Sequence, residues 1–87
     1  MEFSEIIKGF KAKEGGKRVG QIDFNIHDGV MRITHTEVDE NHQGKGIATE
    51  LVLRAVAYAR LRDLKVLPLC AVAAHVLKKE EFSDILA

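Results

Sequence analysis

Two glycines with a lysine between them stand where an expected strand gives way to an expected helix, in the segment Gln43-Gly44-Lys45-Gly46-Ile47-Ala48. The first turn of a helix has main-chain amides without partners and the positive end of the helix dipole, so it favours an anion, and phosphate above all. Glycine lacks the Cβ that would hinder this approach. Each charge-assisted hydrogen bond from such a loop is worth about 1.5–3 kcal/mol. We therefore predict that the loop binds a pyrophosphate.

The spacing of this loop differs from two common nucleotide-binding glycine motifs. The loop lacks the G-x-x-x-x-G-K-[ST] pattern, and position 49 is threonine where the dinucleotide motif G-x-G-x-x-G requires glycine. A second interpretation stays open on spacing alone. In it, the glycines only supply the backbone angles that a strand–helix connection needs.

A single cysteine and a histidine are the other candidates for chemistry. Cys70 ends an apolar run and begins an apparent helix, where the helix dipole stabilises a thiolate. His35 stands on an expected neighbouring strand and is a candidate general base. Structural roles remain the alternative, with Cys70 as a small core residue and His35 as a packed, hydrogen-bonded side chain.

The first half of the chain is expected to form an antiparallel sheet. An opening strand lies around Ile6 to Phe10 and ends at the glycine pair of KEGGKR. Apolar and polar residues then alternate in VGQIDFNIHDG and VMRITHTEV, with a turn signal at Asp28-Gly29 between them. These segments predict a three-stranded antiparallel meander.

The second half changes to a helical period. Apolar residues recur at helical spacing from Gly46 to about Arg62, LKVLPLC is typical of a short buried strand, and AVAAHVLKKEEF predicts a second helix. Because a strand–helix–strand unit crosses over right-handed, the strands that end at Val38 and Cys70 should be parallel neighbours. The expected fold class is α+β (mixed α/β), a three-stranded meander followed by a β-α-β-α unit.

Composition narrows the possible classes of protein. The 87 residues predict one domain over residues 1–87, and 13 basic against 13 acidic residues argue against bulk nucleic-acid binding. No apolar run approaches the ~20 residues of a membrane span. One cysteine and four scattered histidines predict no internal disulfide, no structural zinc site and a reducing, cytoplasmic compartment. We expect a monomer or a weak homodimer.

Specific residues resemble those of the GNAT N-acetyltransferase superfamily, whose pyrophosphate motif is Q/R-x-x-G-x-G/A. Here that motif is Gln43, Gly46 and Ala48. The segments ITHTEVDENHQGKGIATELV and LKVLPLCAVAAHVLKKEEF resemble more narrowly the small single-domain GNAT-like proteins of the Yjdj-type group. These proteins show H-T-x-V before the loop and P-x-C or S-C at the end of the next strand. The resemblance runs from about Gly20 to the C-terminus. The chain departs from the group in having C-A-V after the strand, and it has no room for the two helices that wall the acceptor site of larger GNAT enzymes.

The resemblance implies a GNAT-like mixed sheet whose two parallel strands splay apart beyond a bulge, and it implies acetyl-coenzyme A (acetyl-CoA) as the cofactor. The pantetheine arm would lie in the gap along one strand, the pyrophosphate would sit on the glycine loop, and a threonine hydroxyl would add a contact. The residues expected to bind the cofactor are Thr36, Glu37, Val38, Gln43, Gly44, Lys45, Gly46, Ile47, Ala48 and Thr49.

The resemblance also implies an active-site pair. Cys70 would accept the acetyl group as an acetyl-cysteine, and His35 would act as base toward Cys70 or toward an acceptor amine, small molecule or peptide, that the residues do not identify. Glu37 is an alternative base, and His42 either caps the loop region or contacts phosphate. The predicted function is acetyl transfer; the alternative is a coenzyme A (CoA)-binding module without turnover. An adaptor role would rest on Lys45 and three helix arginines, which more simply form a solvated face.

Overall fold

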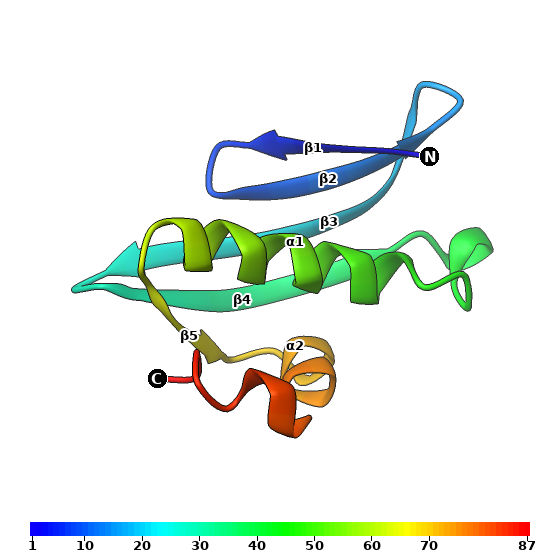
Figure 1. The fold of residues 1–87 in the computed structure, drawn as a ribbon. Helices are drawn as coiled ribbons and strands as arrows, with labels where there is room; N and C mark the ends of the chain where they lie inside the picture. The colour runs from blue at the N-terminus through cyan, green and yellow to red at the C-terminus, as the bar shows by residue number, and fades with distance from the viewer.

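One mixed five-stranded sheet forms the body of the molecule, and helix α1 crosses its face (Figure 1). The computed structural model describes all residues from Met1 to Ala87. The strands lie in the order β1-β2-β3-β4-β5, with antiparallel pairing up to β4 and parallel pairing between β4 and β5.

Their bounds are β1 Glu2–Ile6, β2 Gly9–Glu14, β3 Lys17–His27, β4 Val30–Val38 and β5 Lys65–Pro68. The helices are α1 Ile47–Leu61 and α2 Ala71–Leu77, with 3₁₀ turns η1 Glu40–His42 and η2 Glu80–Phe82. The expected fold class and the parallel pairing across the crossover helix are confirmed.

The opening segment contains two strands, so the antiparallel meander has four strands rather than the predicted three. The chain reverses at Ile7 and Lys8, where Lys8 takes a positive φ of 61° and Ile7 is 92% exposed. Neither residue type is a usual turn former. The glycine comes one position later, because a Cβ on Gly9 would lie 2.0 Å from the carbonyl oxygen of Ile22 on β3.

β4 has a bulge at the position where its pairing with β5 stops. Asp23 on β3 pairs with His35, and Phe24 pairs with Ile33, so Thr34 has no partner on β3. Pairing of β4 with β5 stops at Ile33 and Pro68. β5 itself ends at Pro68, so no strand lies beside β4 from Thr34 onward on this side.

Helix α1 holds this sheet through one apolar stripe. Its buried residues are Ile47, Leu51, Val52, Ala55, Val56 and Ala59, which is the stripe expected from the sequence. Leu51 has no exposed surface, and burying a leucine side chain is worth about 1.5–3 kcal/mol. The same core continues into α2 through Ala73 and Leu77. Neither helix combines the length and apolar character needed to cross a bilayer.

The C-terminal residues complete the far edge of the sheet. Helix α2 ends at Leu77, earlier than the sequence suggested, and the tail returns to lie beside β5. Val66 donates its amide to the carbonyl of Ile85 (2.8 Å) and accepts from the amide of Ala87 (2.9 Å). Asp84 accepts two hydrogen bonds from the Arg60 guanidinium, and these hold the pKa of Asp84 below its usual range.

We predict that Gly9→Ala destabilises the protein more than any substitution of an exposed turn glycine. The added Cβ would force β2 away from β3, at a cost of about 3 kcal/mol or more in the free energy of unfolding. Gly29→Ala is the matched control, because its Cβ meets nothing within 4 Å and only the positive φ of 76° is strained, at about 1–2 kcal/mol. Urea unfolding of both variants measures the difference. An equal or smaller loss in Gly9→Ala would contradict the close approach.

Candidate functional site

The loop between β4 and α1 is shaped by two glycines in the left-handed region. Gly44 and Gly46 both have φ of 79°, and Gly46 is the N-cap of α1. A residue with a Cβ reaches this conformation only at a cost. A Cβ built on either glycine meets nothing within 4 Å, so both positions face open space. The glycines therefore serve the backbone conformation and leave the start of α1 uncovered.

The amides of this loop donate to no acceptor within the protein. The first main-chain bond of the helix runs from Glu50 to the carbonyl of Gly46, at 3.0 Å, and no side chain caps the helix. The main-chain N–H groups of residues 44–49 thus have no protein partner. Such a row of donors at the positive end of a helix is suited to an anion.

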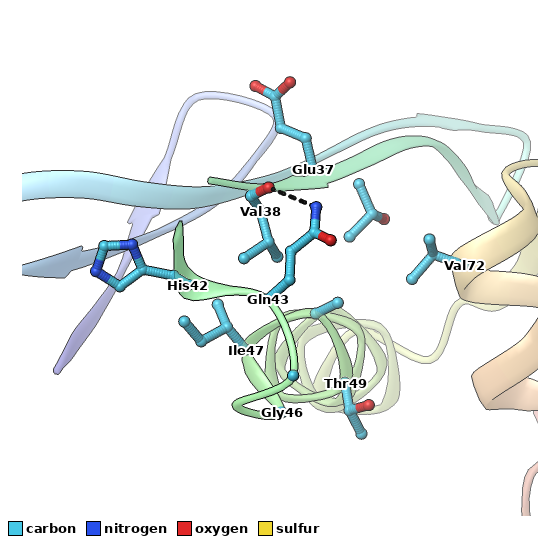
Figure 2. Close-up of a pocket in the computed structure, with 11 residues that line it drawn as sticks. Glu37, Val38, His42, Gln43, Gly46, Ile47, Thr49 and Val72 are labelled. Atoms are coloured by element: carbon cyan, nitrogen blue, oxygen red, sulfur yellow. Dashed lines mark hydrogen bonds between the residues drawn. The ribbon is translucent and has the colours of Figure 1, made fainter. Parts of the chain in front are cut away.

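A cavity of about 580 Å³ opens directly beside these amides (Figure 2). It lies between the end of β4, the loop, the first turn of α1 and the start of α2. The residues predicted to bind the cofactor all line it except Lys45, which lines a smaller hollow beside Met1 and Phe3. The structure adds His42 and Val72 to the lining. Val72 was not singled out from the sequence, where it reads only as an apolar residue of the second helix.

The side chain of Gln43 connects the glycine loop to the end of β4 at the wall of the cavity. Its side-chain amide donates to the carbonyl of Val38 at 3.4 Å, which joins the loop to the end of β4 (Figure 2). The bond is long and exposed, so it contributes little to stability. A ligand that pairs with the backbone of Val38 would compete with it.

His42 fixes the loop to the sheet. Its Nε2 lies 3.0 Å from a carboxylate oxygen of Glu14 at the end of β2, and its Nδ1 lies 3.1 Å from one of Asp39. The side chain is 19% exposed. In Figure 2 the imidazole points away from the Gln43 side of the loop. Of the two roles predicted for His42, these contacts favour support of the loop over contact with phosphate.

Cys70 stands beside the cavity as the N-cap of α2. Its half-buried Sγ accepts a hydrogen bond from the amide of Ala73 at 3.4 Å, and Oγ1 of Thr36 lies 3.4 Å from it. Thr36 lines the cavity, as does Val72, two residues after Cys70, whereas Cys70 itself does not line it. The amides of Leu69 and Cys70 donate to the carbonyl of Ile33 at 2.9 and 3.2 Å, which fixes the turn after β5 against the bulged part of β4.

The structure does not bring His35 into contact with Cys70. His35 is exposed, and its Nε2 lies 3.2 Å from a carboxylate oxygen of Glu37, two residues along β4. Alternation along the strand places these two side chains on the face opposite Thr36, and the Glu37 carboxylate points away from α1 in Figure 2. The predicted direct pair of His35 with Cys70 is thus replaced by a contact between Thr36 and Cys70. A role of His35 toward an acceptor amine stays a prediction.

The fold agrees with comparison to known proteins. The model of the GCN5-related N-acetyltransferase family matches residues 9–85, and the chain belongs to this family. The solution structure of a GCN5-like protein from Staphylococcus aureus superposes with a TM-score of 0.78 at 26% identity, covering 99% of this chain and 87% of that one.

Two crystal structures similar to this chain contain the coenzyme. One is a Mycobacterium tuberculosis protein in complex with CoA (TM-score 0.64, 26% identity, 70% of this chain and 40% of that one). The other is a GNAT family acetyltransferase from Brucella melitensis in complex with acetyl-CoA (TM-score 0.65, 23% identity, 71% of this chain and 45% of that one). The chain spans less than half of both proteins. No curated protein matches it by sequence.

We predict that His42→Phe loosens the loop while leaving the sheet intact. The variant keeps a ring of similar size but loses both contacts to carboxylates, at a cost of about 1–2 kcal/mol. Limited proteolysis between residues 39 and 46 should become faster, and the urea midpoint should fall. His27→Phe is the matched control, because His27 pairs only with its exposed neighbour Asp28. Equal effects in the two variants would argue against a tether.

Proposed function

We propose that this chain binds acetyl-CoA in the 580 Å³ cavity and transfers the acetyl group to an amine. The observation that carries the proposal is the row of unpartnered amides at residues 44–49, which opens onto the gap where β4 and β5 part. Family membership supports the reaction class, and the complexes of similar proteins with CoA support the ligand.

Each part of acetyl-CoA has a matching region of the cavity. The amides of the loop bind the pyrophosphate, with the Thr49 hydroxyl as a further donor and Lys45 as a nearby positive charge. The backbone of β4 from Thr36 to Val38 has no strand beside it on the β5 side, so it can pair with the amides of the pantetheine arm. The acetyl end then lies toward Cys70.

Acetyl transfer through Cys70 follows from this orientation. The Cys70 thiolate attacks the thioester carbonyl, the new bond to Sγ forms, and CoA leaves as its thiolate. An acceptor amine then attacks the acetyl-cysteine and restores the thiol. His35, on the open face with Glu37, removes the proton that the amine loses. Direct transfer to the amine is the other route that the same cavity allows.

A CoA-binding module without turnover is the second candidate function. The observation in its favour is the exposure of His35 and Glu37, whose side chains are 57% and 64% accessible. No further element covers that face to form a walled acceptor site. The two candidates share the same cavity and differ only in whether an amine is acetylated.

We predict that Gly46→Trp weakens acetyl-CoA binding by at least about tenfold, because the indole would occupy the space in front of the amides. Gly29→Trp is a matched control, since Gly29 also has a positive φ and open space but lies at the β3–β4 turn, far from the cavity. Isothermal titration calorimetry of wild type and both variants gives the comparison. The loop assignment fails if Gly46→Trp binds like wild type.

We predict that incubation with acetyl-CoA under reducing conditions adds one acetyl group to the protein and that Cys70→Ala abolishes the adduct. Intact-mass spectrometry detects it, and cleavage by hydroxylamine identifies a thioester. Amine acetylation that continues unchanged in Cys70→Ala would contradict the acetyl-cysteine route and leave direct transfer. Binding without acetylation of any amine in a broad screen would favour the binding module.

A further inference from the structure

We propose that Thr36 is the positioning residue for Cys70, and that its hydroxyl, rather than His35, stabilises the thiolate that attacks the substrate. This role rests on the function proposed above, in which Cys70 is the nucleophile. The experiment that tests it measures only the ionisation of Cys70 and needs no acetyl-CoA. Two groups converge on Sγ at the same distance, 3.4 Å: the main-chain amide of Ala73 and Oγ1 of Thr36. No side-chain base and no charged group makes a hydrogen bond with the sulfur.

The bulge in β4 is what gives Thr36 this position. Because Thr34 has no partner on β3, the alternation of side chains is reset between Ile33 and His35. Ile33 faces the core, His35 and Glu37 face solvent on the other side, and Thr36 is half-buried beside the cavity. The carbonyl of Ile33 then holds the turn at Cys70 by two amides, so Sγ and Oγ1 are brought together from both chain segments.

The two donors act selectively on the ionised form of Cys70. A thiolate has no proton and can only accept, while a threonine hydroxyl rotates to donate or to accept. With Sγ as a thiol, the contact to Thr36 is a weak hydrogen bond in either direction. With Sγ as a thiolate, both the hydroxyl and the Ala73 amide donate to a full charge, and such bonds are the stronger ones. Removing the hydroxyl therefore disfavours the thiolate more than the thiol.

With this assignment, the residues on the two faces of β4 have different roles. Thr36 supports the nucleophile on the cavity side, and the proton from the Cys70 thiol passes to solvent, because the sulfur is only half-buried. His35 and Glu37 remain available on the opposite face for the acceptor amine. The attack itself is unchanged: the bond from Sγ to the acetyl carbon forms as the bond to the CoA sulfur breaks.

The test is the pH profile of Cys70 alkylation by iodoacetamide, in which the thiolate displaces iodide and forms a thioether. It needs no acetyl-CoA and is measured from about pH 5 to pH 10. In Thr36→Val we expect the midpoint of the profile to move up by about one pH unit, which makes alkylation about threefold slower below the midpoint: the thiolate fraction falls about tenfold, and the more basic thiolate reacts about threefold faster. The limiting rate at high pH should rise by about threefold, because a more basic thiolate is a better nucleophile, whereas reduced access to the thiol would lower it. Thr36→Ser should restore the wild-type midpoint.

Thr34→Val is the matched control. It makes the same change two residues away on β4, where the hydroxyl bonds to the carbonyl of Asp23 instead of to sulfur. An unchanged midpoint in Thr36→Val, or an equal shift in Thr34→Val, would overturn the proposal. A wild-type thiol that resists alkylation over the whole range would overturn it as well. A shifted midpoint with no acetyl adduct would uphold the role of Thr36 and reject only the acetyl-cysteine route.

Discussion

Main-chain amides without acceptors at the start of α1 are the feature on which the cavity, the loop and the proposed chemistry depend. Six consecutive N–H groups, from Gly44 to Thr49, have no hydrogen-bond partner within the protein. Buried amides are nearly always satisfied, so such a row is tolerable only where water or a ligand reaches it. The two left-handed glycines keep the row uncovered, and His42 holds the loop that carries it.

The separation of β4 from β5 gives the amides a cavity to face. The strands stop pairing at Ile33 and Pro68, and the bulge at Thr34 comes immediately after the last pair. Two irregularities act together here: β5 ends at Pro68, which leaves backbone of β4 without a neighbouring strand, and the bulge decides which side chains of β4 face the gap. Thr36 is turned toward Cys70, while His35 and Glu37 are turned to the other face. In the proposed function, the cofactor therefore lies on one side of β4 and the acceptor amine on the other.

Much of this arrangement is visible in the sequence, because it depends on local chemistry. The glycine loop, the apolar stripe of α1 and the crossover to a parallel strand were all predicted from spacing, and nearly all the predicted cofactor residues surround one cavity. The missed features are those that depend on contacts between distant segments. The turn at Ile7 and Lys8 uses residues that do not favour turns, and the strand-like tail depends on its pairing with Val66. The contact of Thr36 with Cys70 depends on the bulge at Thr34, which shifts the side-chain alternation by one residue; the family resemblance implies a bulge but does not give its position.

The most direct measurement is a titration of ¹⁵N-labelled protein with CoA, followed through the main-chain amide resonances. The largest shifts should fall on the amides of residues 44–49, with a second group at Thr36 to Val38, and all should saturate at one ligand per chain. Titration with 3′,5′-adenosine diphosphate, which lacks the pyrophosphate and the pantetheine arm, should leave the second group unmoved. Saturable binding whose shifts lie elsewhere, with residues 44–49 unchanged, would contradict the central role of the unpartnered amides.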